Sequence, residues 1–364
     1  MSEQRVRVQA PSNIALIKYM GKKDASLNIP ENSSLSLTLN SLCTYVDVRI
    51  QASDQSSLRW LPELPAYPSV PCAESKVTSP VLPPFKDSDL IRVSRHFERV
   101  KKRLPEIYSP FELEYREDWA SSAAVELRTA NTFPASSGIA SSASSFAGMT
   151  LAFLAAYARD LDLFKEKWEK DFSFRRTIAQ VSRMGSGSSC RSFEGPWVVW
   201  EGERSQEFQA PQLPPVSHFV VLIQTLPKKV SSSEAHSLVR TSPLWQGRVE
   251  RVESRLAVCK KALHAGDFSA LARVAWAETW EMHSLFHTAA DPFTYWAPGT
   301  VLGLTELGKW INTESPPLVT LDAGPNIHVI VESHRRSEWR ERLRECFSNS
   351  VILEDKQGQG ARFF

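Results

Sequence analysis

A loop crowded with small residues, followed directly by an alanine-rich apolar segment, is the feature that most constrains the fold of this 364-residue chain. The loop reads NTFPASSGIASSASSFA from Asn131 to Ala147, and the segment after it reads MTLAFLAAYA. Gly, Ser and Ala let backbone N–H groups approach a ligand, and a helix N-terminus adds unsatisfied donors and partial positive charge. The pattern predicts a phosphate site at a helix start. The alternative is a serine-rich connection in which Ser141 or Ser142 only caps a buried helix.

The composition limits the class of protein. With 42% hydrophobic and 23% charged residues, the chain is long enough for one large or two ordinary globular domains. The net charge of +2 and the interleaved acids and bases give no bias toward polyanions, so we expect neither nucleic acid nor a membrane as a partner. We see no signal-peptide core or bilayer-spanning run, and the five cysteines contain no CxxC pair. We therefore expect a cytoplasmic protein with reduced thiols.

The first half of the chain predicts β structure followed by helices. Alternating residues indicate strands in RVRVQA and LSLTLNSLCTYVDVRI, and seven prolines near residues 61–84 indicate a surface insert without regular structure. A helix with a basic face is expected near residues 88–104. Strands are expected in FELEYRED and AAVELRTA, and helices over residues 148–183.

The second half begins after Pro211, Pro214 and Pro215, which mark the expected boundary between lobes at residues 1–208 and 209–364. HFVVLIQT then predicts a strand, and residues 244–287 predict a long helical region broken near Gly266. PLVTLDAGPNIHVIVE predicts two short strands around a turn, and a charged helix is expected from Ser337. Mixed rather than regularly alternating elements indicate an α+β fold in two lobes.

A second cluster, SNIALIKYMGKKD, places basic and hydroxyl groups at the end of an apolar run. Lys18 follows the run, and Tyr19 and Lys22 lie beside Gly21. Such donors suit an anionic substrate, although a solvated basic turn has the same composition.

The third cluster, RMGSGSSCRSF, combines two glycines with several donors. Ser186, Ser188 and Arg191 lie in one short loop and form a candidate grip for phosphate or carboxylate. Cys190, in the same loop, is expected to be a small buried thiol rather than a nucleophile.

In the fourth cluster, TLDAGPN, an acid lies between an apolar strand and a Gly-Pro turn. Asp322 is either an Asx-turn residue or a positioned base. The chain contains neither GxxxxGK[ST] nor a complete GxGxxG, so a P-loop enzyme and a Rossmann dehydrogenase are not supported. His283 and His287 have the i,i+4 spacing of a metal pair but lack the HExxH glutamate, and we assign them no metal.

Taken in order, these clusters resemble the diphosphomevalonate decarboxylase family of the GHMP small-molecule kinase superfamily. The resemblance covers nearly the whole chain outside the Pro-rich insert, and it is carried by SNIALIKYMGKKD, LNIPENSSLSLTL, NTFPASSGIASSAS, RMGSGSSCRSFEG, KKVSSSEAHSLVRTSP and TLDAGPN. It implies an N-terminal lobe like ribosomal protein S5 domain 2, a ferredoxin-like C-terminal lobe, and substrates in the cleft between them. It also implies ATP and Mg²⁺ as cofactors and a homodimer.

The resemblance further implies a role for individual residues in the ATP-dependent decarboxylation of (R)-5-diphosphomevalonate to isopentenyl diphosphate. The implied catalytic residues are Asp322, Lys18 and Arg191, and Arg191 would also bind the substrate carboxylate. The residues implied to bind the substrate phosphates are Tyr19, Lys22, Ser186 and Ser188. The residues implied to bind the ATP phosphates are the loop residues Pro134, Ser136, Ser137, Gly138, Ala140, Ser141 and Ser142. Ser141 or Ser142 would help to bind Mg²⁺.

The chain departs from the family pattern at several positions. Met20 stands where the family usually has Trp, and Ser233 and His236 stand where some bacterial members have Arg and Met. Near His287 the sequence also differs from the usual Leu-Asp-Thr-x-Pro-Pro. These differences concern the choice of substrate more than the type of reaction, and a 5-phosphomevalonate decarboxylase is a closely related alternative. A mevalonate 3-kinase without decarboxylation is another. A protein that binds nucleotide and substrate without turnover is the alternative from another class.

Overall fold

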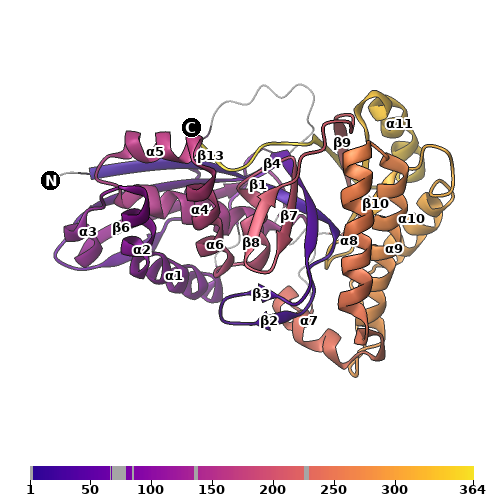
Figure 1. Cartoon of the computed structure of the whole chain (residues 1–364), viewed down its shortest axis with the longest axis horizontal. Coiled ribbons are helices and arrows are strands. Elements are labelled where there is room, and N and C mark those ends of the chain that lie inside the picture. Colours follow the sequence, from indigo (N-terminus) through magenta and orange to yellow (C-terminus); the bar gives the residue numbers. More distant parts are fainter. Residues whose placement is uncertain (1–2, 66, 68–78, 84–85, 135–137, 225–228) are drawn as a thin grey trace.

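The computed structural model describes residues 3–65, 67, 79–83, 86–134, 138–224 and 229–364. Two sheets, each covered by helices, lie next to each other along the long axis of the molecule (Figure 1). The expected Pro-rich insert near residues 61–84 falls partly outside the described residues. The arrangement is a mixture of sheet and helix in two parts, as the α+β prediction requires.

The first sheet is built on two long antiparallel strands, β1 (Glu3–Ile17) and β4 (Ser34–Ala52). Both were predicted from the alternation of apolar and polar residues, and both are confirmed. The chain returns to this sheet with β13 (Arg362–Phe363), which pairs with β1. The other strands of this sheet are β5 (Ser57–Trp60), β6 (Ala123–Asn131), β7 (Trp197–Glu201) and β8 (Arg204–Glu207).

Helix α4 (Ser141–Tyr157) packs directly on the two long strands. A Cβ on Gly148 would lie 2.7 Å from Cγ2 of Val46, so glycine allows the helix to approach the sheet closely. This contact fixes the position of the N-terminus of α4. The surrounding helices are α1 (Asp87–Lys102), α2 (Leu104–Tyr108), α3 (Glu117–Ser121), α5 (Leu161–Lys170) and α6 (Phe172–Arg183).

The helices predicted over residues 148–183 are confirmed, and two aspartates divide the region. Asp160 accepts backbone N–H bonds at the start of α5, and Asp171 does the same at the start of α6. These side chains satisfy the donors of a helix N-terminus, so each begins a new helix. Helix α1 confirms the basic helix expected near residues 88–104.

The strand predicted in FELEYRED is wrong. Residues Ser109–Phe111 form a short 3₁₀ turn, and α3 begins at Glu117. Glu112 adopts a φ of 57°, in the left-handed region, which interrupts an extended backbone. The neighbouring prediction, AAVELRTA, is confirmed as β6.

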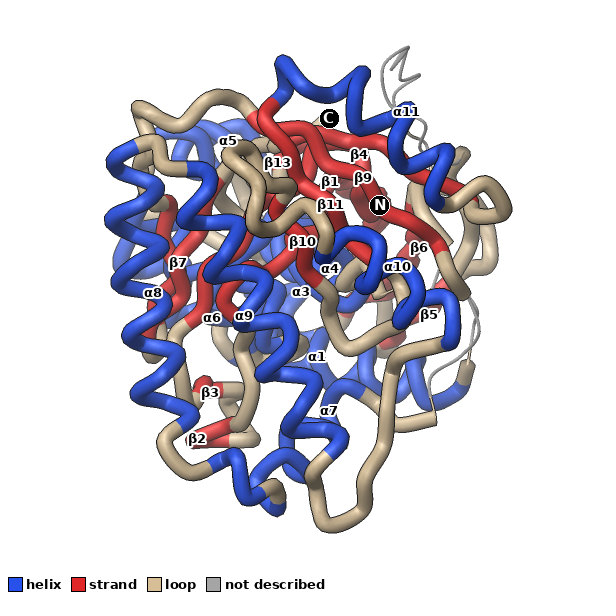
Figure 2. Tube along the Cα trace, turned by 90° about the vertical axis from the view of Figure 1, so that its right-hand side faces the viewer, coloured by secondary structure: helices blue, strands red, loops and turns tan. Residues whose placement is uncertain are grey.

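The second sheet has the order β10-β11-β9-β12, with strands β9 (Val216–Leu222), β10 (Leu318–Thr320), β11 (Ile327–Glu332) and β12 (Val351–Lys356). The tube in Figure 2 shows α8 and α9 running side by side beside it. The break expected near Gly266 is confirmed, since this residue ends α8 with a φ of 70°. The helices are α7 (Ser232–Leu238), α8 (Arg248–Ala265), α9 (Phe268–His287), α10 (Pro298–Gly308) and α11 (Arg336–Cys346).

One hydrophobic cluster joins the two halves of the chain. It contains Ile14 of β1 and Leu37 of β4 together with Val220 of β9, Leu256 of α8 and Leu271 of α9. The ends of β1 and β10 are therefore held against each other by a shared core. The lobe boundary at residues 208 and 209 stays a prediction. Across the described residues we find no helix long and apolar enough to cross a membrane.

Candidate active site

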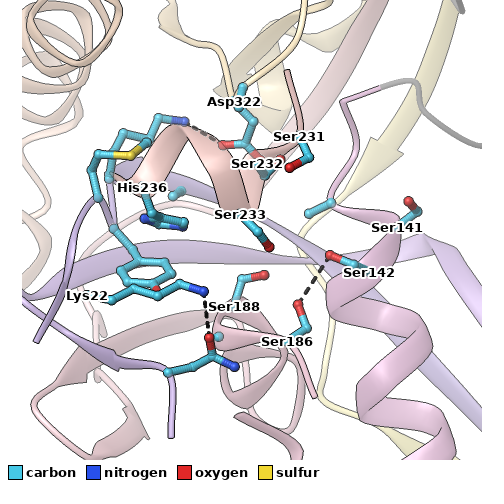
Figure 3. Close-up of a pocket in the computed structure, with 18 of the residues that line it drawn as sticks. Lys22, Ser141, Ser142, Ser186, Ser188, Ser231, Ser232, Ser233, His236 and Asp322 are labelled. Atoms are coloured by element: carbon cyan, nitrogen blue, oxygen red, sulfur yellow. Dashed lines mark hydrogen bonds and ion pairs between the residues drawn. The ribbon is translucent and has the colours of Figure 1, made fainter. Parts of the chain in front are cut away.

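A cavity of about 510 Å³ lies between the two halves and is lined by residues from both (Figure 3). Its walls come from the residues after β1, the loop 185–188, the first turn of α4, α7, and the turn after β10. Among the lining residues that the structure describes, five are lysine or arginine and only Asp322 is acidic. The cavity is therefore suited to an anionic ligand.

Lys18 and Asp322 form an ion pair in this cavity, although 304 positions separate them in the sequence. The Nζ of Lys18 donates to Oδ1 of Asp322 at 2.8 Å. Lys18 is only 2% exposed, whereas the side chain of Asp322 is 23% exposed and lines the cavity. A backbone bond from Gly324 to the carbonyl oxygen of Asp322 closes the turn, which leaves the carboxylate free for Lys18.

The surroundings shift both pKa values of this pair. Burial alone would raise the pKa of Asp322, but the nearby positive charges, that of Lys18 first, hold it below its ordinary value. Burial lowers the pKa of Lys18, and the charge of Asp322 opposes that shift. Asp322 is therefore a carboxylate at neutral pH.

Arg191 is a buried guanidinium held by neutral groups. Its Nε donates to Oδ1 of Asn13 at 3.2 Å, and its Nη1 donates to Oγ of Ser34 at 2.6 Å. The guanidinium also lies 5.8 Å from the ring centre of Trp200. No carboxylate of the described residues forms an ion pair with it, so a bound anion would supply the missing negative charge.

The loop 185–188 is held close to its neighbours by its glycines. A Cβ on Gly185 would lie 2.1 Å from Cδ1 of Phe146, and one on Gly187 would lie 2.9 Å from Tyr19. Ser186 and Ser188 line the cavity, and Oγ of Ser186 donates to Oγ of Ser142 at 3.2 Å (Figure 3). The second and third clusters of the sequence therefore meet at one wall.

The start of α4 contradicts the capping alternative. The N-cap is Ala140, with a φ of 47°, and within the described part of the chain no side-chain hydrogen bond caps this helix. Ser141 and Ser142 are instead its first two residues, and they line the cavity with Gly138 and Ala140. The N–H of Ala143 donates to the carbonyl oxygen of Ala140, and no backbone acceptor among the described residues takes the N–H groups of Ser141 and Ser142, which leaves these two for a ligand.

Two of the expected ATP-binding residues, Ser136 and Ser137, lie outside the described residues. Pro134 does not line the cavity. Tyr19 does, and its hydroxyl is buried without a hydrogen-bond partner among the described residues. Cys190 is buried, as expected, and burial raises its pKa to about 11, so it is a neutral thiol.

Lys22 reaches the cavity from a small hairpin of β2 (Lys22–Asp24) and β3 (Ile29–Pro30). Its Nζ donates to Oδ1 of Asn28 at 2.7 Å. The amide of Asn28 in turn donates to the carbonyl oxygens of Arg183 and Met184, so the end of α6 fixes the lysine. Figure 3 shows Lys22 on the side of Ser188, away from Asp322.

Several lining residues were not predicted as site residues: Asn28, Lys86, Arg92, Ser231, Ser232, Ser233, His236 and Met282. Four of these, the three serines and His236, lie in the segment KKVSSSEAH, whose similarity to the family could have indicated them. Arg92 could have been inferred from the basic face of α1. His236 accepts the backbone N–H of Gly21 through Nδ1 at 3.0 Å. Burial and the charge of Lys22 lower the pKa of His236 to about 3, so its imidazole is neutral.

His283 and His287 have different surroundings. His283 is fully buried against Phe286 and Trp296, whereas Nε2 of His287 lies 3.1 Å from Oγ1 of Thr294. Within the described ranges, no group of three or more His, Cys, Asp and Glu residues could hold a metal ion. The hydroxyls of Ser141 and Ser142 still suit Mg²⁺, which takes few protein oxygens when it binds together with phosphates.

Two family models cover most of the chain. Residues 10–71 and 83–210 match the diphosphomevalonate decarboxylase-like N-terminal domain, and residues 218–361 match the mevalonate 5-diphosphate decarboxylase C-terminal domain. Among curated proteins, the diphosphomevalonate decarboxylase of Schizosaccharomyces pombe is 30% identical over 335 residues, which cover 88% of this chain and 76% of that protein. The enzyme of Ganoderma lucidum is 28% identical over 98% of this chain and 86% of its own length.

Solved structures agree with these matches. A mevalonate diphosphate decarboxylase from Legionella pneumophila superposes with a TM-score of 0.74 and 32% identity, over 96% of this chain and all of that one. The complex of MDDEF with MVAPP, AMPPCP and magnesium superposes with a TM-score of 0.78 and 26% identity, over 100% of this chain and 99% of that one.

Proposed function

Since this chain belongs to the diphosphomevalonate decarboxylase family, we propose that it converts (R)-5-diphosphomevalonate and ATP to isopentenyl diphosphate, ADP, phosphate and CO₂. The observation that carries the proposal is the Lys18–Asp322 pair, which opens into the same cavity as Arg191 and the first turn of α4. This cavity joins a carboxylate, an unpaired guanidinium and an anion-binding helix start.

Family membership confirms the expected two-lobed GHMP kinase fold, with its S5 domain 2-like and ferredoxin-like lobes. The cofactors ATP and Mg²⁺ follow from the same likeness. In this chain the N–H groups at the start of α4, with Ser141 and Ser142, would hold the ATP phosphates. Mg²⁺ bound there would offset the negative charge that develops on the transferred phosphoryl group.

Asp322 would act in phosphoryl transfer to the tertiary hydroxyl. A tertiary alcohol is a poor nucleophile, so a carboxylate that orients it or takes its proton accelerates attack on the γ-phosphorus. Lys18 keeps this carboxylate ionised and fixes its position through the 2.8 Å contact. Its ammonium also offsets negative charge in the transition state.

Arg191 would act in the second stage. When the tertiary C–O bond breaks, phosphate leaves and a cation-like carbon remains. The electrons of the carboxylate C–C bond then form the double bond, and CO₂ departs. A guanidinium that holds the carboxylate by two parallel bonds keeps it in place until that moment, and burial strengthens the interaction.

The substrate phosphates would bind to the opposite wall. Tyr19, Lys22, Ser186 and Ser188 all line it and supply hydroxyl and ammonium donors. The unpartnered hydroxyl of Tyr19 supports this assignment, because a buried donor without a partner is costly unless a ligand satisfies it.

The test is to incubate the purified protein with ATP and Mg²⁺ and, in separate reactions, mevalonate, its 5-phosphate or its 5-diphosphate. We expect stoichiometric ADP and CO₂ from the diphosphate. If only the monophosphate yields CO₂, the substrate is 5-phosphomevalonate and not the diphosphate. ADP without CO₂ would indicate a 3-kinase. The absence of both products would indicate binding without turnover.

We also propose that the protein is a homodimer, that it is located in the cytoplasm, and that its lobes meet at residue 208. The first rests on the family resemblance, and the second on the five widely spaced cysteines of the sequence, an odd number without a CxxC pair. Light scattering at several protein concentrations tests the dimer.

A further inference from the structure

Two buried histidines lie inside the hydrophobic cluster that joins the two halves of the chain. His218 of β9 and His328 of β11 are both fully buried. The strand register places His328 opposite Val220 and His218 opposite Ile330, so both imidazoles share a face of the sheet with residues of that cluster. A polar side chain in such a place is costly unless hydrogen bonds satisfy it.

The two imidazoles form a hydrogen-bonded chain that ends on the loop before α4. Nε2 of His218 lies 2.9 Å from Nδ1 of His328, and Nε2 of His328 lies 3.3 Å from the carbonyl oxygen of Gly138. The two rings are stacked, with centres 5.1 Å apart. The chain therefore runs from β9 through β11 to a residue just before the N-cap of α4.

The acceptor at the end of this chain decides where each proton lies. A carbonyl oxygen can only accept, so His328 donates to Gly138 through Nε2. Burial lowers the pKa of His328 to about 4 and that of His218 well below its ordinary value, so both rings are neutral. Nδ1 of His328 therefore accepts, and His218 donates to it through Nε2. Nδ1 of His218, which has no partner among the described residues, is then a lone pair and not a buried N–H.

Gly138 also lies beside the turn that carries Asp322. A Cβ on Gly138 would lie 3.7 Å from Cα of Gly324, and both Gly138 and Asp322 line the cavity. His328 follows this turn at the start of β11. One side chain thus connects the strand after Asp322 to the loop before α4, and its hydrogen bond holds the helix start near the carboxylate.

We propose that His328, oriented by His218, is a positioning residue for ATP. Its bond to Gly138 holds the loop so that a nucleotide bound there presents its γ-phosphate to the tertiary hydroxyl beside Asp322. His328 does not itself line the cavity, so it acts through the loop. An error of about 1 Å in such an alignment can lower a rate about 100-fold. This inference rests on the proposed function, in which the loop and the start of α4 bind ATP.

Four variants separate this hydrogen bond from packing. His328→Gln keeps the donor, because its amide Nε2 lies as many bonds from Cα as the imidazole Nε2. His328→Leu removes every polar atom of the side chain, and His328→Asn keeps polar atoms only near the position of Nδ1, too far from Gly138. Ile330→Val is the control for lost packing, since Ile330 is fully buried on the same face of β11.

Fluorescence titration with a non-hydrolysable ATP analogue and Mg²⁺ would measure the nucleotide Kd, and CO₂ release would give kcat and the KM for diphosphomevalonate. We expect His328→Leu and His328→Asn to raise this Kd about 3- to 10-fold, the loss of one neutral hydrogen bond. Their kcat should fall about 10-fold or more, because the γ-phosphate is misplaced. The KM for diphosphomevalonate should stay the same. His328→Gln should keep wild-type constants, and Ile330→Val should lower only the melting temperature.

A loss in His328→Gln as large as that in His328→Leu, or an unchanged Kd in His328→Leu, would overturn the role of His328 while leaving the proposed function intact. A wild-type protein that binds the nucleotide but releases no CO₂ from any mevalonate phosphate would overturn the proposed function. The nucleotide Kd values would still decide the role of His328 in that case.

Heteronuclear NMR of the imidazole nitrogens in the wild-type protein tests the chain without any substitution. We expect His218 and His328 to be neutral rings that carry their proton on Nε2. A proton on Nδ1 of His328 would overturn the proposal, since that ring could not donate to the carbonyl oxygen of Gly138.

Discussion

The carboxylate of Glu278 accepts the backbone N–H of Lys18, with Oε1 3.2 Å from the nitrogen. Glu278 is fully buried in α9, and it also pairs with the fully buried Arg248 and with Arg255. A charged network between α8 and α9 thus holds the backbone of Lys18 just beyond the end of β1.

Glu278→Gln should therefore weaken the fold and misplace Lys18. Removing the charge leaves Arg248 buried with less compensation, and such losses cost about 3–5 kcal/mol. Urea unfolding would measure the loss, and kcat at a temperature where the variant is folded would report on Lys18. Glu250→Gln, an exposed change on α8, is the control and should leave both values unchanged. Unchanged stability in Glu278→Gln would contradict a structural role for this network.

Asp322→Asn should lower kcat about 10²- to 10⁴-fold, because the amide cannot take the hydroxyl proton. Nucleotide affinity should stay nearly the same, since the start of α4 lies on another wall of the cavity. Quenched-flow measurement of ADP and fluorescence titration with a nucleotide analogue separate the two effects. A severe loss of nucleotide affinity would count against the role of Asp322 as a base.

Arg191→Lys should uncouple the two stages of the reaction. Lysine keeps the charge but loses the planar fork, so it cannot hold a carboxylate by two parallel bonds or reproduce the contacts with Asn13 and Ser34. We expect CO₂ formation to fall about 10- to 100-fold and ADP to exceed CO₂. Parallel assays of both products decide the matter, and a constant one-to-one ratio would show that Arg191 does not act in the second stage.

The order of the sequence motifs predicted the main residues that line the cavity. That these residues lie close together could be seen only in the tertiary structure. Nothing in the periodicity brings Lys18 to Asp322, which follows a strand of the other sheet; only the family resemblance paired them. Arg92 was missed because a basic stripe on a helix is usually a solvated face. Its contacts with Gly185 and Phe146 come from distant segments and leave no local pattern.

The errors and omissions in the fold have equally local causes. FELEYRED has a strand-like composition, yet the left-handed backbone of Glu112 ends any extended run. The two residues of β13 are too few to give a signal, and their pairing with β1 depends on where the chain returns. Long alternating or apolar segments, such as β4 and α4, were predicted because they are long and apolar enough for burial to decide their structure, and nearly all of their residues are buried.

Stability should fall as the pH drops from about 6.5 to 4. Burial is the main cause that lowers the folded-state pKa of six histidines: to about 4 for His328, to about 3 for His96, His236 and His283, well below the ordinary value for His218, and in the same direction for His287. Because each is neutral in the fold and charged when unfolded, protonation favours the unfolded chain. Their contribution is complete above the unfolded pKa and is lost as the pH falls through this window.

Asp355 acts in the opposite direction over the same range. Burial raises its pKa to about 6 and also raises the pKa of Glu194, so protonation of these two acids favours the fold, but they are two groups against six histidines. Urea unfolding at several pH values gives the slope. His328→Gln should flatten it, and exposed His264→Gln should leave it unchanged. Stability that rises on acidification would contradict the assignment of neutral histidines.

Gly185→Ala should disturb substrate binding more than nucleotide binding. The added methyl would lie 2.1 Å from Cδ1 of Phe146 and 2.7 Å from Nδ1 of His96, so the loop or the ring must move. Overpacking of this kind costs about 1–3 kcal/mol, and the displaced loop carries Ser186 and the anchor of Arg92. We expect a lower melting temperature and a raised KM for the phosphorylated mevalonate. Gly308→Ala is the control, because its Cβ would meet Trp276 at an ordinary 3.5 Å. Unaltered kinetics in Gly185→Ala would show that the position of this loop does not limit substrate binding.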